Sequence, residues 1–323
     1  MKMIVTRGGF LTSVQDLGRT GFREFGVSLG GALDPFALRV ANLLVDNDEG
    51  AAGLEITFGG LQLHFADERA VAWCGGEFDV QIESMPLPAG HAARLQAGEE
   101  LKFGRPQIGC RCWLAISSGV DVPVVLGSRS TDLRANFGGF HGRALRDGDE
   151  LALGEFRRSQ TAAIEGISSW TAPYDWVSPA KRDPTLRFVR GVDWSQFDDL
   201  TIERFTSEPF AVSPDSDRMG ARFEGPELKR KSNVDLVSEA VAPGTIQVPP
   251  SGKPILLLGD CQTIGGYPKI AYLITLDLSM AAQLRAGDHV RFSEVSLADA
   301  HQLLLERERE LERFRIGLSL HVS

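Results

Sequence analysis

Short β-forming segments separated by glycine run through most of this 323-residue sequence. Clear examples are LEITFGGLQLHF from Leu54, RAVAWCGG from Arg69 and IQVPPSGKPILLLGD from Ile246. The 35 glycines and 16 prolines supply the turn residues that many short strands need. The pattern predicts a mainly β protein with few helices, built from barrels or sandwiches.

Two segments are exceptions and predict helices. DPFALRVANLLVDN begins with Asp34, a good N-cap, and places Pro35 at the first helical position. SLADAHQLLLERERELERFR begins with Ser296, three residues before Asp299, as in a variant of the capping box. Its apolar stripe consists of Leu297, Ala300, Leu304, Leu311 and Phe314. This C-terminal helix could pack on its own domain or on a partner.

The chain also contains weak internal repeats, called echoes below. LQAGEELKFG from Leu95, LRDGDELALG from Leu145 and LRAGDHVRFS from Leu284 each predict a glycine turn that leads into a strand. A longer echo pairs a region near the start with one after residue 186, and each contains a similar R-x-G-x-R motif, at 19–23 and at 218–222. Duplication of one β domain would explain these echoes, and shared turn chemistry alone would explain about half of them. A polar, proline-bearing stretch separates the halves, so we predict domains at 1–160 and at 161–323, the second including the linker and the C-terminal helix.

Composition narrows the classes of function. With 43% hydrophobic and 24% charged residues, the chain can bury a sizeable core. A net charge of −9 argues against broad nucleic-acid binding, although local arginine clusters could hold a small anion. No apolar run has the length of a signal peptide or a membrane span, so we expect a cytoplasmic protein that does not bind membranes.

The cysteines and histidines show no metal-binding pattern. Cys110 and Cys112 would share one face of a strand, and neither a C-x-x-C pair nor an H-x-x-x-H spacing occurs. The four cysteines are therefore predicted to be free thiols, buried or partly buried, and no metal site is expected.

Polar side chains concentrate in four glycine-rich segments, where small residues let a backbone approach a ligand closely. The segments begin at Thr12, Leu126, Ser213 and Gly259. Their candidate residues are Gln15, Asp16, Arg19, Arg23, Asp34, Ser128, Arg129, Ser130, Thr131, Asp132, Arg134, Arg218, Asp260, Gln262, Thr263, Tyr267 and Lys269. Each cluster has a structural alternative, because Asp–Arg pairs in turns are mostly surface ion pairs below about 1 kcal/mol, and Asp or Ser beside glycine often only closes a turn. Because four such clusters occur in one acidic chain, we expect that together they form a ligand-binding or catalytic site.

Common catalytic motifs are missing from these segments. Neither G-x-x-x-x-G-K-[ST] nor a strand-borne G-x-G-x-x-G occurs, so no self-contained nucleotide motif is present. The string GVSLG at 26–30 matches G-x-S-x-G, but no strand-like segment leads into it, so it lacks the strand–turn–helix setting of a nucleophile elbow.

Several of these stretches together resemble one family. TSVQDLGRTGFREFGV, GALDPFALRVANLLVDN, GSRSTDLRANFGGFHGRALRDGD, SDRMGARFEG and SEAVAPGTIQVPPSGKPILLLGDCQTIGGYPKIA are similar, in order, to the biotin-dependent carboxyltransferase family. That family includes KipA proteins, the C subunits of 5-oxoprolinases and the allophanate hydrolase subunit 2 domain, which is also part of urea carboxylase. The resemblance implies two cyclophilin-like β-barrel domains that arose by duplication. Cys261 departs from the family pattern, which argues against a catalytic thiol.

The resemblance also implies partners and a reaction. A KipI-like protein would share a cleft with this chain, and a LamB/YcsF-type protein would complete an ATP-dependent 5-oxoprolinase. That enzyme converts 5-oxo-L-proline, ATP and water to L-glutamate, ADP and phosphate, and this chain is not expected to be active alone. The alternatives are a carboxyltransferase half that moves a carboxyl group from carboxybiotin to urea or a similar amide, and a KipA-like regulator that binds a kinase inhibitor.

Both reactions polarise the carbonyl of a planar amide, which calls for preorganised hydrogen-bond donors. By resemblance, Arg19, Arg129 and Arg218 would bind the oxyanion or another anion, with Asp16 and Asp132 holding them in place. Predicted catalytic residues are Arg19, Arg129, Asp132, Asp260 and Gln262. Predicted substrate-binding residues are Gln15, Asp16, Arg218, Thr263, Gly265, Gly266 and Tyr267. The two glycines would allow close approach, and Tyr267 would offer a stacking face.

Overall fold

The computed structural model describes residues 2–155, 164–232 and 236–322. The chain separates into two compact units. The first unit contains residues 1–19, 30–180 and 309–323, and the second contains residues 20–29 and 181–308. The predicted boundary between residues 160 and 161 lies outside the described residues. Each unit therefore combines segments that are far apart in the sequence.

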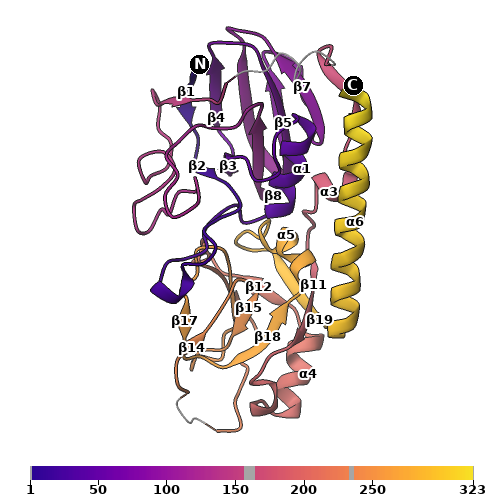
Figure 1. Ribbon diagram of the computed structural model, residues 1–323. Coiled ribbons are helices and arrows are strands. Elements are labelled where there is room, and N and C mark those ends of the chain that lie inside the picture. Colours follow the sequence, from indigo (N-terminus) through magenta and orange to yellow (C-terminus); the bar gives the residue numbers. More distant parts are fainter. Residues whose placement is uncertain (1, 156–163, 233–235, 323) are drawn as a thin grey trace. The chain divides into compact units, whose positions relative to one another are not determined.

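Among the described residues, the first unit is built on a ten-stranded antiparallel sheet (Figure 1). Its strands are β1 (Lys2–Gly8), β2 (Leu11–Gln15), β3 (Gly53–Thr57), β4 (Leu61–Phe65), β5 (Arg69–Ile82), β6 (Met85–Pro86), β7 (His91–Leu95), β8 (Glu100–Ile116), β9 (Glu150–Ala152) and β10 (Ile167–Thr171). The main order is β10-β7-β5-β8-β4-β1-β9, and β2 joins through β3, which pairs with β8. Alternation sets the core: in β4, Leu61, Leu63 and Phe65 are buried while the residues between them are half-buried.

Helix α1 (Pro35–Leu44) packs against β5 and β8. It begins where the sequence predicts, because the Asp34 carboxylate accepts a hydrogen bond from the Ala37 N–H at 2.9 Å and Pro35 occupies the first turn. The short helix α3 (Tyr174–Val177) lies against α1, and the Trp176 ring meets Phe36 edge-on.

Within the described residues, the second unit is a closed seven-stranded barrel, consistent with a cyclophilin-like fold. Its strands, in barrel order, are β11 (Thr185–Arg190), β18 (Lys269–Leu273), β15 (Thr245–Gln247), β16 (Ile255–Leu257), β13 (Gly220–Glu224), β12 (Phe210–Val212) and β19 (His289–Glu294). A parallel pairing of β11 with β19 closes it. The barrel core is aromatic and contains Phe188, Phe205, Phe210, Phe223 and Phe292. The chain is therefore mainly β, as predicted.

Smaller elements complete the second unit. They are η1 (Arg23–Phe25), η2 (Trp194–Gln196), α4 (Asp199–Ser207), η3 (Thr275–Asp277), α5 (Leu278–Ala281) and a short two-stranded sheet of β14 (Glu239–Ala240) and β17 (Ile264–Gly265). Helix α4 packs against β19. The β14–β17 sheet carries the middle of the polar segment that begins at Gly259.

The three echoed turns share one geometry. Gly98, Gly148 and Gly287 all have φ near +90°, which suits glycine. In each turn an acidic side chain accepts a hydrogen bond from the backbone N–H three residues earlier: Glu99 from Gln96, Asp149 from Arg146, and Asp288 from Arg285. Each turn leads directly into a strand, namely β8, β9 or β19. The prediction of glycine turns feeding strands is confirmed, and the local chemistry alone explains the resemblance of the three turns.

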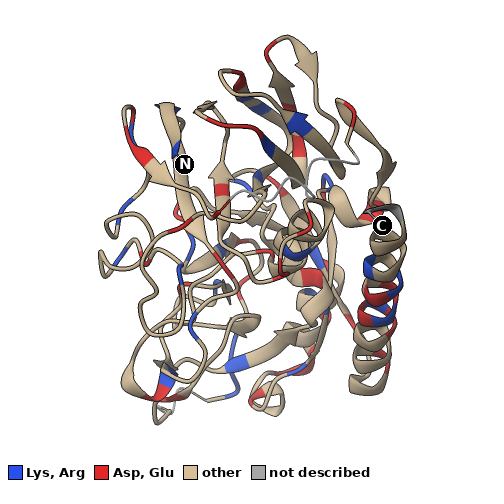
Figure 2. Cartoon of the chain, turned by 45° about the horizontal axis from the view of Figure 1, so that its top comes forward, with Lys and Arg blue, Asp and Glu red and all other residues tan. Residues whose placement is uncertain are grey.

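Helix α6 (Leu297–Val322) is the long C-terminal helix in Figure 1. The Ser296 hydroxyl accepts the Asp299 N–H at 3.0 Å and donates to its carboxylate at 2.7 Å, so the predicted cap forms. Leu311 is buried, and Phe314 lies against the Trp176 ring at 5.6 Å. Leu297 departs from the predicted stripe, because it is 59% exposed at the first turn. Charged residues of both signs alternate along the solvent side (Figure 2).

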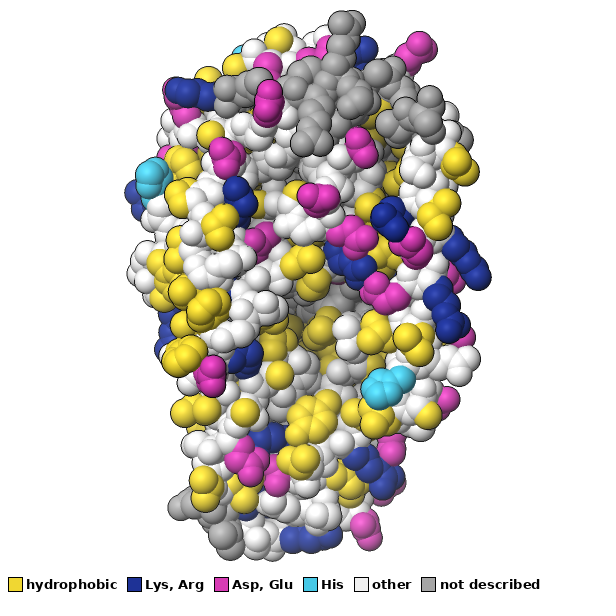
Figure 3. Space-filling view, in the orientation of Figure 1, with side chains coloured by type: hydrophobic (Ala, Val, Ile, Leu, Met, Phe, Trp, Pro, Cys, Tyr) yellow, Lys and Arg dark blue, Asp and Glu magenta, His cyan; other side chains and the backbone are white. Residues whose placement is uncertain are grey.

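The surface carries mixed charge. On the face shown in Figure 3, acidic and basic side chains are interspersed with scattered hydrophobic ones. In the described part of the chain, no helix combines the length and apolar character needed to span a membrane.

Candidate functional site

In the first unit, Asp16 is the anchor of the predicted polar cluster. It follows β2, and its carboxylate accepts hydrogen bonds from the hydroxyls of Ser128 at 2.6 Å and Ser130 at 2.5 Å. It also accepts the backbone N–H groups of Arg129 at 2.5 Å and Gly18 at 2.8 Å. Asp16 therefore holds Arg129 through its backbone rather than through its guanidinium group. A carboxylate with four such donors is fixed in position.

Arg19 lies inside the same loop cluster. Its side chain is fully buried, one guanidinium nitrogen donates to the Ser130 carbonyl, and the group lies 4.6 Å from the centroid of the Phe137 ring. Glycine is required at 138, where φ is +68° and an added Cβ would lie 2.1 Å from the Arg19 guanidinium. Because no part of Arg19 reaches the surface, in this conformation it orders the loop instead of contacting a ligand.

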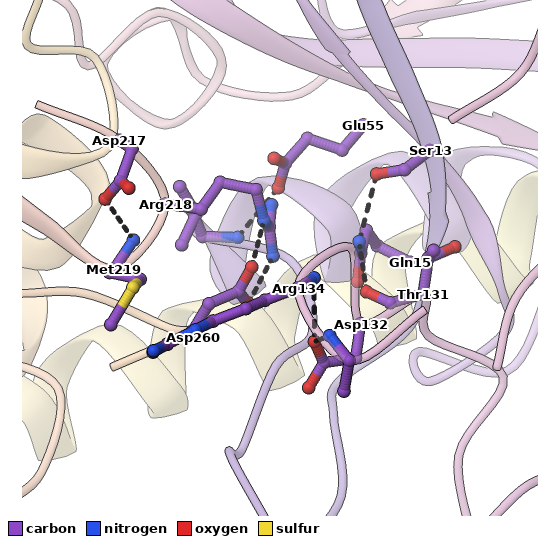
Figure 4. Close-up of polar contacts among 12 residues, drawn as sticks. Ser13, Gln15, Glu55, Thr131, Asp132, Arg134, Asp217, Arg218, Met219 and Asp260 are labelled. Atoms are coloured by element: carbon purple, nitrogen blue, oxygen red, sulfur yellow. Dashed lines mark hydrogen bonds and ion pairs between the residues drawn. The ribbon is translucent and has the colours of Figure 1, made fainter. Parts of the chain in front are cut away.

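Gln15 and Asp132 also stabilise the loops (Figure 4). The Gln15 amide nitrogen donates to the Ser13 hydroxyl at 3.0 Å and to the Thr131 carbonyl at 3.2 Å. The Asp132 carboxylate accepts the N–H groups of Arg134 at 3.1 Å and Ala135 at 2.8 Å, which closes a turn. The backbone of Asp132 pairs with that of Phe137. The Asp132 turn thus sets the position of the glycine-rich segment 137–142.

Arg129 is the predicted arginine that borders a cavity in the first unit. The cavity has a volume of ≈ 420 Å³, and its walls include Asp16, Gly119, Asp121 and Arg129. The guanidinium group lies 3.4 Å from the Asp121 carboxylate, with 39% of the Arg129 side chain exposed. An exposed pair at this distance contributes less than about 1 kcal/mol, so the group can turn toward a ligand.

Another cavity of the first unit, ≈ 390 Å³, was not predicted from the sequence. Its lining includes Phe137, Phe140 and His141, together with Asp121, Val122, Pro123 and Val125. The sequence signal for this cavity was the pair Gly138-Gly139, which indicates a closely packed loop. At Gly139 a Cβ would lie 1.8 Å from the Thr131 hydroxyl, so a larger residue does not fit. Arg19 and Asp132, two of the residues predicted as catalytic, thus contact a wall of this cavity through Phe137.

In the second unit, Arg218 and Asp260 form a bidentate ion pair (Figure 4). The two nitrogen–oxygen distances are 2.8 and 3.1 Å, and the side chains are 7% and 6% exposed. The Asp260 N–H also donates to the Arg218 carbonyl at 3.1 Å. The pair joins the segment that begins at Ser213 to the segment that begins at Gly259.

Beside this pair, Cys261 is buried and does not have the features of a nucleophile. Burial raises the pKa of its thiol, and this outweighs the opposite effect of the Arg23 guanidinium. A reactive cysteine would need a lowered pKa and access to solvent. Cys74, Cys110 and Cys112 are also free and buried, so the prediction of free thiols is confirmed.

The rest of the segment surrounds the short β14–β17 sheet. Gly265 packs beside the Gln247 amide, where a Cβ would lie 2.9 Å from the nitrogen, and that amide donates to the Tyr267 carbonyl at 3.3 Å. Lys269 is buried, and its ammonium group pairs with Glu239 at 2.9 Å. The side chains of Gln262 and Thr263 are half-buried, and the Thr263 carbonyl accepts the Val241 N–H.

Gly266 and Tyr267 line a cavity of ≈ 920 Å³ in the second unit. Lys229, Arg230 and Ser238 also line it, and no sequence pattern predicted a role for them. The sequence offers little indication of a binding role for Lys229 and Arg230, because a run of three basic residues, as at 229–231, usually lies on the solvated surface. Within the described residues, no group of three or more His, Cys, Asp or Glu is placed to hold a metal ion.

Comparison with known proteins assigns the family. The model of the carboxyltransferase domain, subdomains A and B, matches residues 25–294, and the chain belongs to this family.

Individual relatives are of two kinds. The chain is 39% identical over 309 residues to the C subunit of 5-oxoprolinase from Escherichia coli (strain K12), with 96% of each chain covered. It is 36% identical over 303 residues to the C subunit of 5-oxoprolinase from Haemophilus influenzae, with 94% of each covered. Among solved structures, the K. lactis urea amidolyase superposes with a TM-score of 0.89 at 28% identity, over 97% of this chain and 20% of that protein.

Proposed function

We propose that this chain is the C subunit of an ATP-dependent 5-oxoprolinase and that it works with a KipI-like protein and a LamB/YcsF-type protein. The observation that carries the proposal is the match to the C subunits of two 5-oxoprolinases, which covers nearly the whole length of this chain and of each relative. The proposed reaction opens the lactam ring of 5-oxo-L-proline to give L-glutamate, with ATP converted to ADP and phosphate.

The chemistry of the sites is compatible with this proposal. Ring opening needs donors that stabilise negative charge on the lactam oxygen, and the Arg129 guanidinium borders a cavity of suitable size for a small amide. Asp16 fixes the backbone at Arg129 through its hydrogen bond to the N–H, so the donor is held on a rigid loop. Gly266 and Tyr267 border the cavity of the second unit. A residue that binds substrate or nucleotide must reach such a cavity, so their position is compatible with that role.

A second candidate is carboxyl transfer from carboxybiotin to urea or a similar amide. The superposition on urea amidolyase favours it, although this chain spans about a fifth of that protein. Biotin would be a ligand only in this second candidate.

The test is glutamate release from 5-oxo-L-proline and ATP, with this chain mixed with candidate KipI-like and LamB/YcsF-type proteins and each component omitted in turn. Glutamate formed by the complete mixture alone is the expected result. No glutamate from partners shown to bind one another would contradict the proposal and favour carboxyl transfer, or regulation by sequestration of a kinase inhibitor.

A variant tests the site within the same assay. Arg129→Ala is expected to lower turnover about a hundredfold, the usual effect of removing an oxyanion donor, with the melting temperature unchanged. Arg105→Ala, at an exposed position of β8, is the matched control and should leave turnover unchanged. Normal turnover by Arg129→Ala would remove Arg129 from the mechanism.

A further inference from the structure

Hydrogen bonds hold part of the backbone that lines the ≈ 920 Å³ cavity of the second unit. The Leu228 N–H donates to the Gly252 carbonyl at 2.9 Å, and the Val248 N–H donates to the Pro268 carbonyl at 3.0 Å. The buried Gln247 amide holds the Tyr267 carbonyl from the barrel side. The volume falls in the range of about 300–1,000 Å³ that is typical of pockets for ligands of drug or nucleotide size. These hydrogen bonds hold the backbone in place at Leu228, Val248 and Tyr267, three of the residues that line the cavity.

The charge of the lining is opposite to that of the whole chain. Lys229 and Arg230 are on the wall with one acidic side chain, that of Glu227, in a protein of net charge −9. Lys229 lies 3.4 Å from the Glu227 carboxylate, and both side chains are mostly exposed, so this contact is weak and the ammonium group can turn to a stronger anion. A local cationic wall in an acidic protein favours a phosphate or carboxylate group over a neutral ligand.

The other part of the lining suits a flat ring. Tyr267 is 45% exposed, and Pro249, Pro250 and Val248 provide apolar surface in the same cavity. Gly266 lets a ligand approach the backbone closely, since it carries no side chain beside the Ser238 hydroxyl. Aromatic side chains stack on nucleobases, and basic groups bind phosphates.

We propose that this cavity binds a nucleoside triphosphate, with the phosphates against Lys229 and Arg230 and the base against Tyr267. The proposed function suggests ATP as the nucleotide, and the inference rests on it for that choice alone. The site uses no glycine-rich phosphate loop, which is why motif analysis of the sequence does not find it.

The test is isothermal titration of the full chain with ATP, and with adenosine and inorganic tripolyphosphate as separate probes. We expect ATP to bind more tightly than either fragment. Tyr267→Ala should weaken ATP binding about tenfold, because base–aromatic stacking contributes at this level, without changing tripolyphosphate binding. Lys229→Ala should weaken both ATP and tripolyphosphate binding. Lys253→Ala, at an exposed lysine paired with Glu224 outside the cavity, is the control and should change neither.

No heat of binding at millimolar ATP would overturn the proposal, as would ATP binding that is insensitive to both cavity variants. Tripolyphosphate binding as tight as ATP binding would also overturn it, because the base would then contribute nothing. These outcomes are separate from glutamate release: a mixture that makes glutamate while this chain fails to bind ATP would refute the nucleotide site and leave the proposed function in place.

Discussion

Arginine side chains with similar sequence surroundings have different roles in this protein. Arg19 and Arg218 begin the two echoed R-x-G-x-R motifs, and both are buried within a polar loop cluster. Arg218 is neutralised by Asp260, whereas Arg19 bonds a carbonyl and lies over an aromatic ring. Arg129 stays half exposed at a cavity. A buried charge needs a fixed partner, so the main role of Arg19 and Arg218 is structural. Arg129, which is partly exposed, is the better candidate for ligand contact.

The Arg218–Asp260 pair leads to a prediction about stability. Arg218→Ala removes both guanidinium hydrogen bonds from a carboxylate that remains buried, which costs about 3–5 kcal/mol in the free energy of unfolding. Urea denaturation measures this cost. Arg222→Ala, at the exposed end of the same motif, is the control and should cost less than about 0.5 kcal/mol. Equal unfolding free energies for the two variants would show that the pair contributes little.

Turns and helix caps show how short elements are specified. The turn before β9 is held by Asp149, which accepts the Arg146 N–H and a bidentate contact from the Arg143 guanidinium at 2.7 and 2.8 Å. The hydrogen bond from Arg143 is the main reason why the pKa of Asp149 lies below its usual value. These contacts lie within seven residues of sequence, and the turn is then docked on β1, where the Gly148 N–H donates to the Val5 carbonyl at 2.8 Å.

The lowered pKa of Asp149 predicts a dependence on pH. The folded state keeps this carboxylate ionised to lower pH than the unfolded chain does, so its contribution to stability is complete above about pH 4 and is lost as the pH falls through the lower folded pKa. Asp149→Asn should therefore cost roughly 1 kcal/mol at neutral pH, a modest value because the pair is partly solvated, and less in acid. Urea unfolding at both pH values measures the two costs. An equal cost in acid would contradict the assignment.

At the scale of the whole molecule, each unit depends on segments from a distant part of the chain. Residues 20–29 belong to the second unit, where Arg23 donates to the Val241 carbonyl. Residues 309–323 belong to the first unit, where Leu311 is 1% exposed and Phe314 meets Trp176. We therefore expect the stability of the first unit to depend on this part of α6.

Helix α6 offers a matched test of this dependence. Leu311→Ala leaves a cavity in the first unit and should lower the free energy of unfolding by about 2–4 kcal/mol. Leu305→Ala lies on the same helix at a position 56% exposed and should change it by less than about 0.5 kcal/mol. Urea denaturation followed by circular dichroism compares them. A small loss for Leu311→Ala would show that the first unit is stable without this end of α6.

Much of the local structure could be predicted, and the composition of the candidate sites only in part. The caps at Asp34 and Ser296 and the glycine turns at 98, 148 and 287 lie where the sequence predicts them. Gly266 and Tyr267 were predicted to bind a ligand and do line a cavity, whereas Lys229 and Arg230 of the same cavity were not predicted. The difference arises because Tyr267 belongs to a distinctive segment, while a run of basic residues resembles ordinary surface.

The sequence by itself determined the mainly β character, the turns, the helix ends and the polar clusters, since all of these depend on backbone conformation and on neighbours a few residues away. The tertiary structure alone decided that Arg19 is buried while Arg129 is exposed, because burial depends on packing between distant segments such as those of Asp16 and Ser130. It also decided which loops enclose a cavity. Nothing in the local sequence of residues 227–230 shows that they line the same cavity as residues 266–268.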